Sequence, residues 1–155
     1  MTHLLRRSRS DAGFTAVELV VVIVLIGIVG ALAQPAMGAY IGRNKTQRAL
    51  DRMAGDIAMA RMQAVRSGER VVFEVTGPDS YRLWAESTPA QTIRQVSLAS
   101  DYAGVQVQAP TGNGQLVFNA RGLLVSAGTG NLVATLGSAV DTVKITATGM
   151  VYRAY

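Results

Sequence analysis

An uninterrupted apolar segment near the amino terminus constrains the fold of this chain more than any other feature. Residues 14–33 contain Glu18 as their only charged residue. As a helix, which rises about 1.5 Å per residue, this segment would be roughly 30 Å long and would match the hydrocarbon layer of a bilayer. A carboxylate there costs on the order of 2.5–3.5 kcal/mol on insertion scales. We therefore predict a membrane-spanning helix in which Glu18 has a dedicated partner.

Residues 1–13, which precede the apolar segment, form a short basic stretch. They carry Arg6, Arg7 and Arg9 against a single acidic residue. Positively charged flanks stay on the cytoplasmic side of a membrane, so everything after the apolar segment is expected outside the cytoplasm. A secretory signal has its small-residue cleavage site after the apolar core, whereas Gly13 precedes the core here. Cleavage at Gly13 would therefore leave the helix on the mature protein.

The chain has 155 residues, no cysteine and one histidine, His3. Without disulfides, the exported part must be stabilised by packing. Because His3 lies in the basic stretch, a chain cleaved after Gly13 would contain neither histidine nor cysteine. It would lack the usual zinc ligands, the Ser-His and Cys-His nucleophile pairs and the commonest general base. We predict that the protein is not an enzyme and has no catalytic residue, no metal and no cofactor.

Beyond the membrane segment, apolar residues recur at spacings of three and four, which indicates that the helix continues with one face on the rest of the protein. The apolar positions are Leu50, Met53, Ile57, Ala60 and Ala64, while Arg48, Arg52, Asp56, Gln63 and Arg66 lie largely on the other side. Arg52 and Asp56 are expected to pair across one helical turn. Ser67 and Gly68 supply a stop, so we predict one helix from Phe14 to Arg66.

Pro35 is expected to weaken this helix locally. It cannot donate its backbone hydrogen bond and crowds the preceding turn. Together with Gly27 and Gly30, it should make residues 27–35 the softest part of the helix.

From Glu69 onward the periodicity is that of extended chain. Residues 70–75 and 81–84 flank a turn-rich link and predict a β-hairpin. Further short candidate strands lie at 93–98, 105–108, 116–118, 123–125, 132–136, 143–146 and 150–152. We predict an α+β fold in which an antiparallel β-sheet domain packs against the second half of the long helix.

The segment from Gly13 to Ile23 resembles the class III signal of type IV pilins and type II secretion pseudopilins. It combines a short basic leader, a glycine followed by Phe14, a glutamate at the fifth mature position and a long apolar helix. Pro35 lies where such helices commonly carry a proline. Residues 58–75 resemble the helix-to-sheet junction of the minor pseudopilin H and FimT group, and residues 118–122 resemble that group's Phe-x-x-x-Gly turn.

This resemblance implies a pilin fold in three parts. Residues 1–13 would be a leader, residues 14–41 the transmembrane and assembly half of the helix, and residues 42–155 a periplasmic globular domain. A prepilin peptidase would cut between Gly13 and Phe14 and methylate the amine of Phe14. The protein would first be a single-pass inner-membrane protein with a cytoplasmic amino terminus, and later a filament subunit.

The implied partners are the prepilin peptidase, other pilin or pseudopilin subunits and the assembly platform of the inner membrane. The new cationic terminus of Phe14 would face Glu18 of its own or a neighbouring subunit, and their attraction would set the register of assembly. Gly27 and Pro35 would ease the partial unwinding of the helix that is thought to accompany assembly. The implied function is that of a minor subunit, assembled near the tip of a type II secretion pseudopilus or a type IV pilus, that supports protein secretion or pilus biogenesis.

DNA uptake in natural transformation is the alternative, because the FimT branch includes DNA-binding minor pilins. Those proteins carry a C-terminal Gly-Arg-x-Arg type motif, whereas Arg153 is the only arginine in residues 148–155. One cation beside Tyr152 and Tyr155 could touch a phosphate, but affinity through counterion release needs several such contacts. The structural role is therefore favoured over DNA binding.

Overall fold

The structure, a computed structural model, describes residues 14–108, 113–125 and 130–153, except the side chains of residues 33–36. The predicted leader, including Gly13, lies outside the described residues. The chain forms two compact units that divide between Met37 and Gly38.

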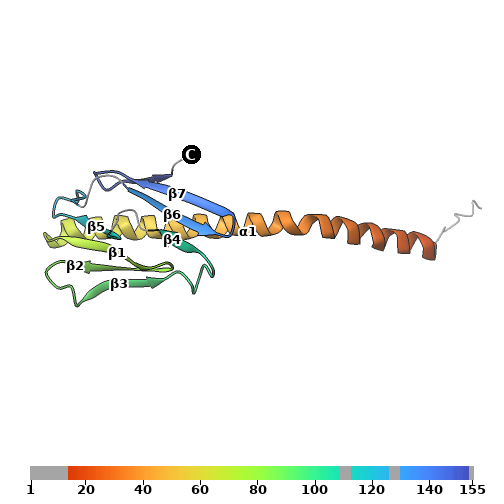
Figure 1. Ribbon diagram of the computed structural model, residues 1–155, viewed down its shortest axis with the longest axis horizontal. Coiled ribbons are helices and arrows are strands. Elements are labelled where there is room, and N and C mark those ends of the chain that lie inside the picture. Colours follow the sequence, from red (N-terminus) through yellow and green to blue (C-terminus); the bar gives the residue numbers. More distant parts are fainter. Residues whose placement is uncertain (1–13, 109–112, 126–129, 154–155) are drawn as a thin grey trace, which may run out of the picture. The chain divides into compact units, whose positions relative to one another are not determined.

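A single helix, α1 (Ala16–Ser67), contributes to both units (Figure 1). Its predicted extent is confirmed to within two residues at each end. The predicted stop is confirmed too, because Gly68 adopts a φ of 71° and donates its N–H to the carbonyl of Ala64 at 3.1 Å. That left-handed backbone conformation favours glycine. The helix is continuous through Pro35, so the weak point near this residue stays a prediction.

In the first unit, α1 is apolar on all sides. The large apolar side chains from Val17 to Leu32 are 47–74% exposed. A helix of this kind is suited to a bilayer or to a bundle of similar helices.

In the second unit, the described residues form two antiparallel sheets of four strands each. The first sheet has the order β3-β2-β1-β5 and the second has the order β4-β6-β7-β8. The strands are β1 (Val71–Gly77), β2 (Ser80–Ala85), β3 (Thr92–Ser97), β4 (Gln106–Gln108), β5 (Gln115–Phe118), β6 (Gly130–Leu136), β7 (Ala139–Ile145) and β8 (Val151–Arg153). The predicted hairpin is confirmed as β1 and β2, with Val72 opposite Trp84.

One predicted strand is wrong. Residues 123–125 form no strand, and Leu124 makes only an isolated bridge to Phe118. The chain instead turns back at Gly122, whose φ is 73°. The side-chain oxygen of Asn119 accepts hydrogen bonds from the backbone N–H groups of Arg121 and Leu123 at 2.9 and 3.0 Å, which fixes the turn.

The core of the second unit lies where α1 meets both sheets, and Figure 1 shows this part of the helix between them. The five apolar helix positions predicted to pack are all fully buried, which confirms that face: Leu50, Met53, Ile57, Ala60 and Ala64. They pack with Phe73 and Phe118 from the first sheet and with Leu132 and Ile145 from the second.

The prediction that Asp56 lies on the open side of the helix is wrong, because only 6% of this residue is exposed. The expected pair with Arg52 is replaced by two longer-range pairs. Arg52 contacts Asp101 at 3.4 Å, and Asp56 contacts Arg94 at 3.4 Å. Both pairs connect the helix to segments that the sequence spacing alone does not bring together.

Candidate assembly surfaces

The amino terminus of α1 is closed by reciprocal hydrogen bonds between Thr15 and Glu18. The backbone N–H and the hydroxyl of Thr15 each donate to Oε2 of Glu18 at 3.1 Å, and the N–H of Glu18 donates to the Thr15 hydroxyl oxygen at 3.2 Å. This arrangement is a capping box, which satisfies backbone donors that a helix start otherwise leaves free. The Thr-x-x-Glu spacing is the sequence signal of such a cap, which was not among the predicted features.

Glu18 therefore has a partner within its own chain as well as a predicted partner on another subunit. Both hydrogen bonds from Thr15 to its carboxylate use Oε2. The side chain of Phe14, the predicted mature terminus, is 81% exposed. Gly13 lies outside the described residues, and the side chain of Pro35 is not described, so the predicted roles of these residues stay predictions.

Arg153, the candidate DNA contact, joins three elements of the fold. Its guanidinium contacts Asp51 of α1 at 2.8 Å and Asp141 of β7 at 3.9 Å. Because Arg153 belongs to β8, these ion pairs hold this short edge strand on the helix and on its neighbour. A phosphate at Arg153 would have to compete with two carboxylates.

Asp56 makes a buried polar contact in the core that the sequence pattern did not predict. The hydroxyl of Tyr81, on β2, donates a hydrogen bond to Oδ2 of Asp56 at 2.6 Å, and Arg94, on β3, contacts Oδ1. Burial and the bond to Asp56 raise the pKa of the Tyr81 hydroxyl above its usual range, so this group stays a donor. The cluster fixes the first sheet on the helix, and helical spacing gives no signal for it.

Glu74 organises the strands of the first sheet in a second polar cluster. Its carboxylate accepts hydrogen bonds from Arg82 at 2.6 Å, from the indole of Trp84 at 3.1 Å and from Gln115 at 3.1 Å. Burial alone would raise the pKa of Glu74, but the donated hydrogen bonds and the charge of Arg82 outweigh it and lower the pKa below its usual value. These bonds tie β1 to the strands on both of its sides.

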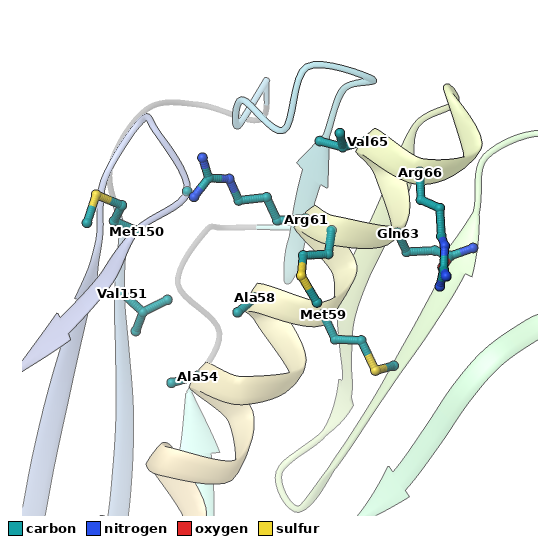
Figure 2. A pocket seen from close by; sticks show the side chains of 11 residues that line it. Ala54, Ala58, Met59, Arg61, Gln63, Val65, Arg66, Met150 and Val151 are labelled. Atoms are coloured by element: carbon teal, nitrogen blue, oxygen red, sulfur yellow. The ribbon is translucent and has the colours of Figure 1, made fainter.

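An open groove of about 950 Å³ lies along the second half of α1 (Figure 2). Its apolar lining comes from two places in the sequence: Ala54, Ala58, Met59, Met62 and Val65 on the helix, and Met150 and Val151, the last of which begins β8. Arg61 and Arg66 are the charged residues of the lining. Because these residues are distant in sequence, no local sequence pattern predicted the groove.

In the described part of the chain, no group of three or more histidine, cysteine, aspartate or glutamate side chains could hold a metal ion. The described polar clusters instead pair acids with arginines and hydroxyls, as around Asp56 and Glu74. Such pairs stabilise contacts between elements.

A family model described as "Type II transport protein GspH" matches residues 49–149, which is more than half of the chain. Two proteins from Pseudomonas aeruginosa named "Fimbrial protein" are each 31% identical over 72 residues, 46% of this chain and 46% of each relative. "Fimbrial protein Q" of Moraxella bovis is 45% identical over 45 residues, 29% of each chain. The chain thus spans less than half the length of these curated relatives.

The fold is similar to that of the type IV minor pilin FimU of Pseudomonas aeruginosa, solved in two crystal forms. One has a TM-score of 0.62 at 16% identity, covering 73% of this chain and 90% of that chain. The other has a TM-score of 0.58 at 15% identity, covering 70% and 92%. These similarities confirm the predicted α+β pilin fold, with its long amino-terminal helix and antiparallel sheets.

Proposed function

This chain belongs to the GspH family of type II transport proteins, and from that premise we propose that it is a minor subunit assembled near the tip of a type II secretion pseudopilus or a type IV pilus. The family consists of pilin and pseudopilin subunits, which are structural proteins and not enzymes. The predicted resemblance to the minor pseudopilin H and FimT group is thereby confirmed. Assembly with other pilin subunits follows from the same membership.

The observation that carries the proposal is the uncovered apolar helix with one acid at its start. Its side chains from Val17 to Leu32 are exposed, and burying each large one is worth about 1.5–3 kcal/mol. A bilayer provides that burial before assembly, and the helices of neighbouring subunits provide it afterwards. The apolar helix is consistent with membrane anchoring, and the basic leader supports an inner-membrane orientation with the amino terminus in the cytoplasm.

Processing would follow from this placement. A prepilin peptidase would remove the leader, residues 1–13, by cleavage between Gly13 and Phe14 and would methylate the new amine. The mature chain would then consist of the assembly half, residues 14–41, and the globular domain, residues 42–155. The inner-membrane platform would then add the subunit to the filament. Glu18 would receive the cationic terminus of Phe14 through Oε1, the carboxylate oxygen that accepts neither hydrogen bond from Thr15.

Two variants separate the two roles of Glu18. Glu18→Gln keeps an acceptor for the capping box but removes the charge, whereas Thr15→Ala removes the capping hydroxyl and keeps the charge. We expect Glu18→Gln to lower the amount of subunit in sheared filaments about tenfold, the effect of about 1.4 kcal/mol, and Thr15→Ala to leave it near the wild-type level. The measurement is the ratio of filament-bound to membrane-bound subunit by immunoblot.

The difference in filament incorporation between Glu18→Gln and Thr15→Ala decides which role Glu18 has. Wild-type incorporation of Glu18→Gln would remove the charge-pairing role. An equal loss in both variants would assign Glu18 to helix capping alone.

DNA uptake gains no support from Arg153, the residue on which that alternative rests. Arg153 is engaged with Asp51 and Asp141, and it is the only arginine in residues 148–155. A phosphate-binding surface needs several cations in reach of one strand. The structural role is therefore the function we propose.

A further inference from the structure

The proposed function assigns no role to the groove along α1. Met62 is 69% exposed and Met150 is 61% exposed, and both line the groove. Exposed apolar side chains gathered in one place mark interaction surfaces. Methionine side chains adapt their shape to what they contact, so they suit a surface that receives another chain.

The charges of the groove define what it can receive. Arg61 and Arg66 line it, and no carboxylate in the described part of the chain forms an ion pair with either of them. Arg61 donates its Nε to the carbonyl of Gly122 at 3.1 Å, which leaves its two terminal nitrogens as donors. Figure 2 shows Arg61 and Arg66 leaving the helix in different directions, so the apolar floor has a cation on either side. An acidic occupant is complementary to this surface.

The wall of the groove beside Met150 is the edge of a sheet. β8 is an outer strand of the second sheet, and no described strand pairs with its open side. The N–H of Thr146 donates to the carbonyl of Met150 at 2.9 Å, and the register continues with Ile145 opposite Val151. Because bonded and non-bonded pairs alternate in an antiparallel ladder, the backbone N–H and C=O of Val151 point to the open side.

We propose that this groove binds an extended segment of a neighbouring filament subunit, which adds to β8 as a fifth strand of the second sheet. Its apolar side chains would pack on Ala58 and Met62, and its carboxylate would pair with Arg61. The inference rests on the proposed function, because the occupant is taken to come from another pilin subunit. Strand addition supplies affinity through backbone hydrogen bonds and specificity through alternate side chains.

The helix surface below β8 leaves room for such a strand. Ala54 and Ala58 carry short side chains at the floor of the groove, and a strand added to a sheet lies about 4.8 Å from its neighbour. A bulkier floor would fill this space. The arrangement also protects an edge that would otherwise stay open to unspecific pairing.

The test uses the isotope-labelled full-length chain in lipid nanodiscs and three capped synthetic peptides of about eight residues. The first alternates valine and threonine and ends in glutamate, the second has lysine in place of that glutamate, and the third is the glutamate peptide with alternate backbone nitrogens methylated. We expect the first peptide to bind about tenfold more tightly than the other two and to shift the amide resonance of Val151.

Three variants complete the test. Arg61→Gln should abolish the preference for glutamate over lysine, whereas Arg48→Gln, an exposed arginine of the same helix outside the groove, should preserve it. Ala58→Trp fills the groove from an exposed position and should abolish binding without unfolding the core.

Equal binding of the glutamate and lysine peptides would overturn the proposal, and so would resonance shifts that map away from β8. Equal binding of the methylated peptide would assign the groove to a helix or an acyl chain instead of a strand. Peptide binding does not depend on filament assembly. A chain that binds the peptide but never enters a filament would contradict the proposed function and the neighbouring subunit as occupant, while strand binding at β8 would still hold.

Discussion

At the scale of single residues, Tyr81 and Asp56 make the contact that most directly attaches the first sheet to the helix. Asp56 is buried, and its carboxylate oxygens are shared between the Tyr81 hydroxyl and Arg94. A buried carboxylate is tolerated only when its oxygens are satisfied in this way. Substitution of Asp56 is therefore expected to lower the free energy of unfolding, although Asp56 belongs to no predicted site.

We predict that Asp56→Ala lowers the free energy of unfolding by about 2–3 kcal/mol, because it leaves the Tyr81 hydroxyl without its acceptor and removes the partner of the partly exposed Arg94 guanidinium. Tyr81→Phe should cost about 1–2 kcal/mol, since Asp56 keeps Arg94. Asp101→Ala is the control, because its pair with Arg52 is exposed and worth about 0–1 kcal/mol. Urea denaturation of the three variants measures the loss of unfolding free energy in each. A loss for Asp101→Ala as large as that for Asp56→Ala would refute the predicted ranking.

Glu74 gives the protein an acid-sensitive contact. Its pKa is lower in the folded than in the unfolded chain, so the carboxylate stabilises the fold above its unfolded pKa of about 4.3. This contribution disappears as the pH falls through the lower, folded pKa. We predict that the wild type loses more stability than Glu74→Gln between about pH 5 and pH 3. Parallel denaturation curves at several pH values measure this, and identical slopes for both proteins would contradict it.

At the scale of elements, the helix and most strands follow from spacing in the sequence, since a buried stripe or an alternating strand leaves a periodic pattern. The five buried positions of α1 and the hairpin of β1 and β2 are examples. Residues 123–125 have the composition of a strand but not its structure, because Asn119 and Gly122 turn the chain. The division into two sheets depends on pairing between distant strands, which local pattern does not encode.

The region from Gly27 to Pro35 supports a prediction about the helix itself. A Cβ added at Gly27 meets no atom within 4 Å in the isolated chain, so a larger residue there is sterically acceptable. We predict that Gly27→Leu combined with Pro35→Ala leaves the folding of the second unit unchanged and stiffens the assembly half. Incorporation into sheared filaments should fall several-fold. Incorporation at the wild-type level would remove the reason for assigning this region a role in assembly.

At the scale of the whole molecule, the parts of the candidate site that the sequence predicted lie within one short segment. The parts that it did not predict combine residues that are distant in sequence. Gly13, Phe14 and Glu18 were assigned from one continuous motif, whose processing and assembly roles stay predictions. The groove joins Ala58 of the helix to Val151 of β8, so only the folded chain shows it. Arg153 was assigned from its place near the end of the sequence, and its two carboxylate partners come from elements distant in sequence.

The central claim is that the apolar helix is retained, with Phe14 as its first residue, in an assembled filament subunit. Mass spectrometry of the amino-terminal peptide from chain recovered in sheared filaments tests this claim most directly. We predict a mature chain that begins at an N-methylated Phe14 and contains Glu18 at its fifth position. A filament-bound chain that still carries the leader, or begins at any other residue, would contradict it.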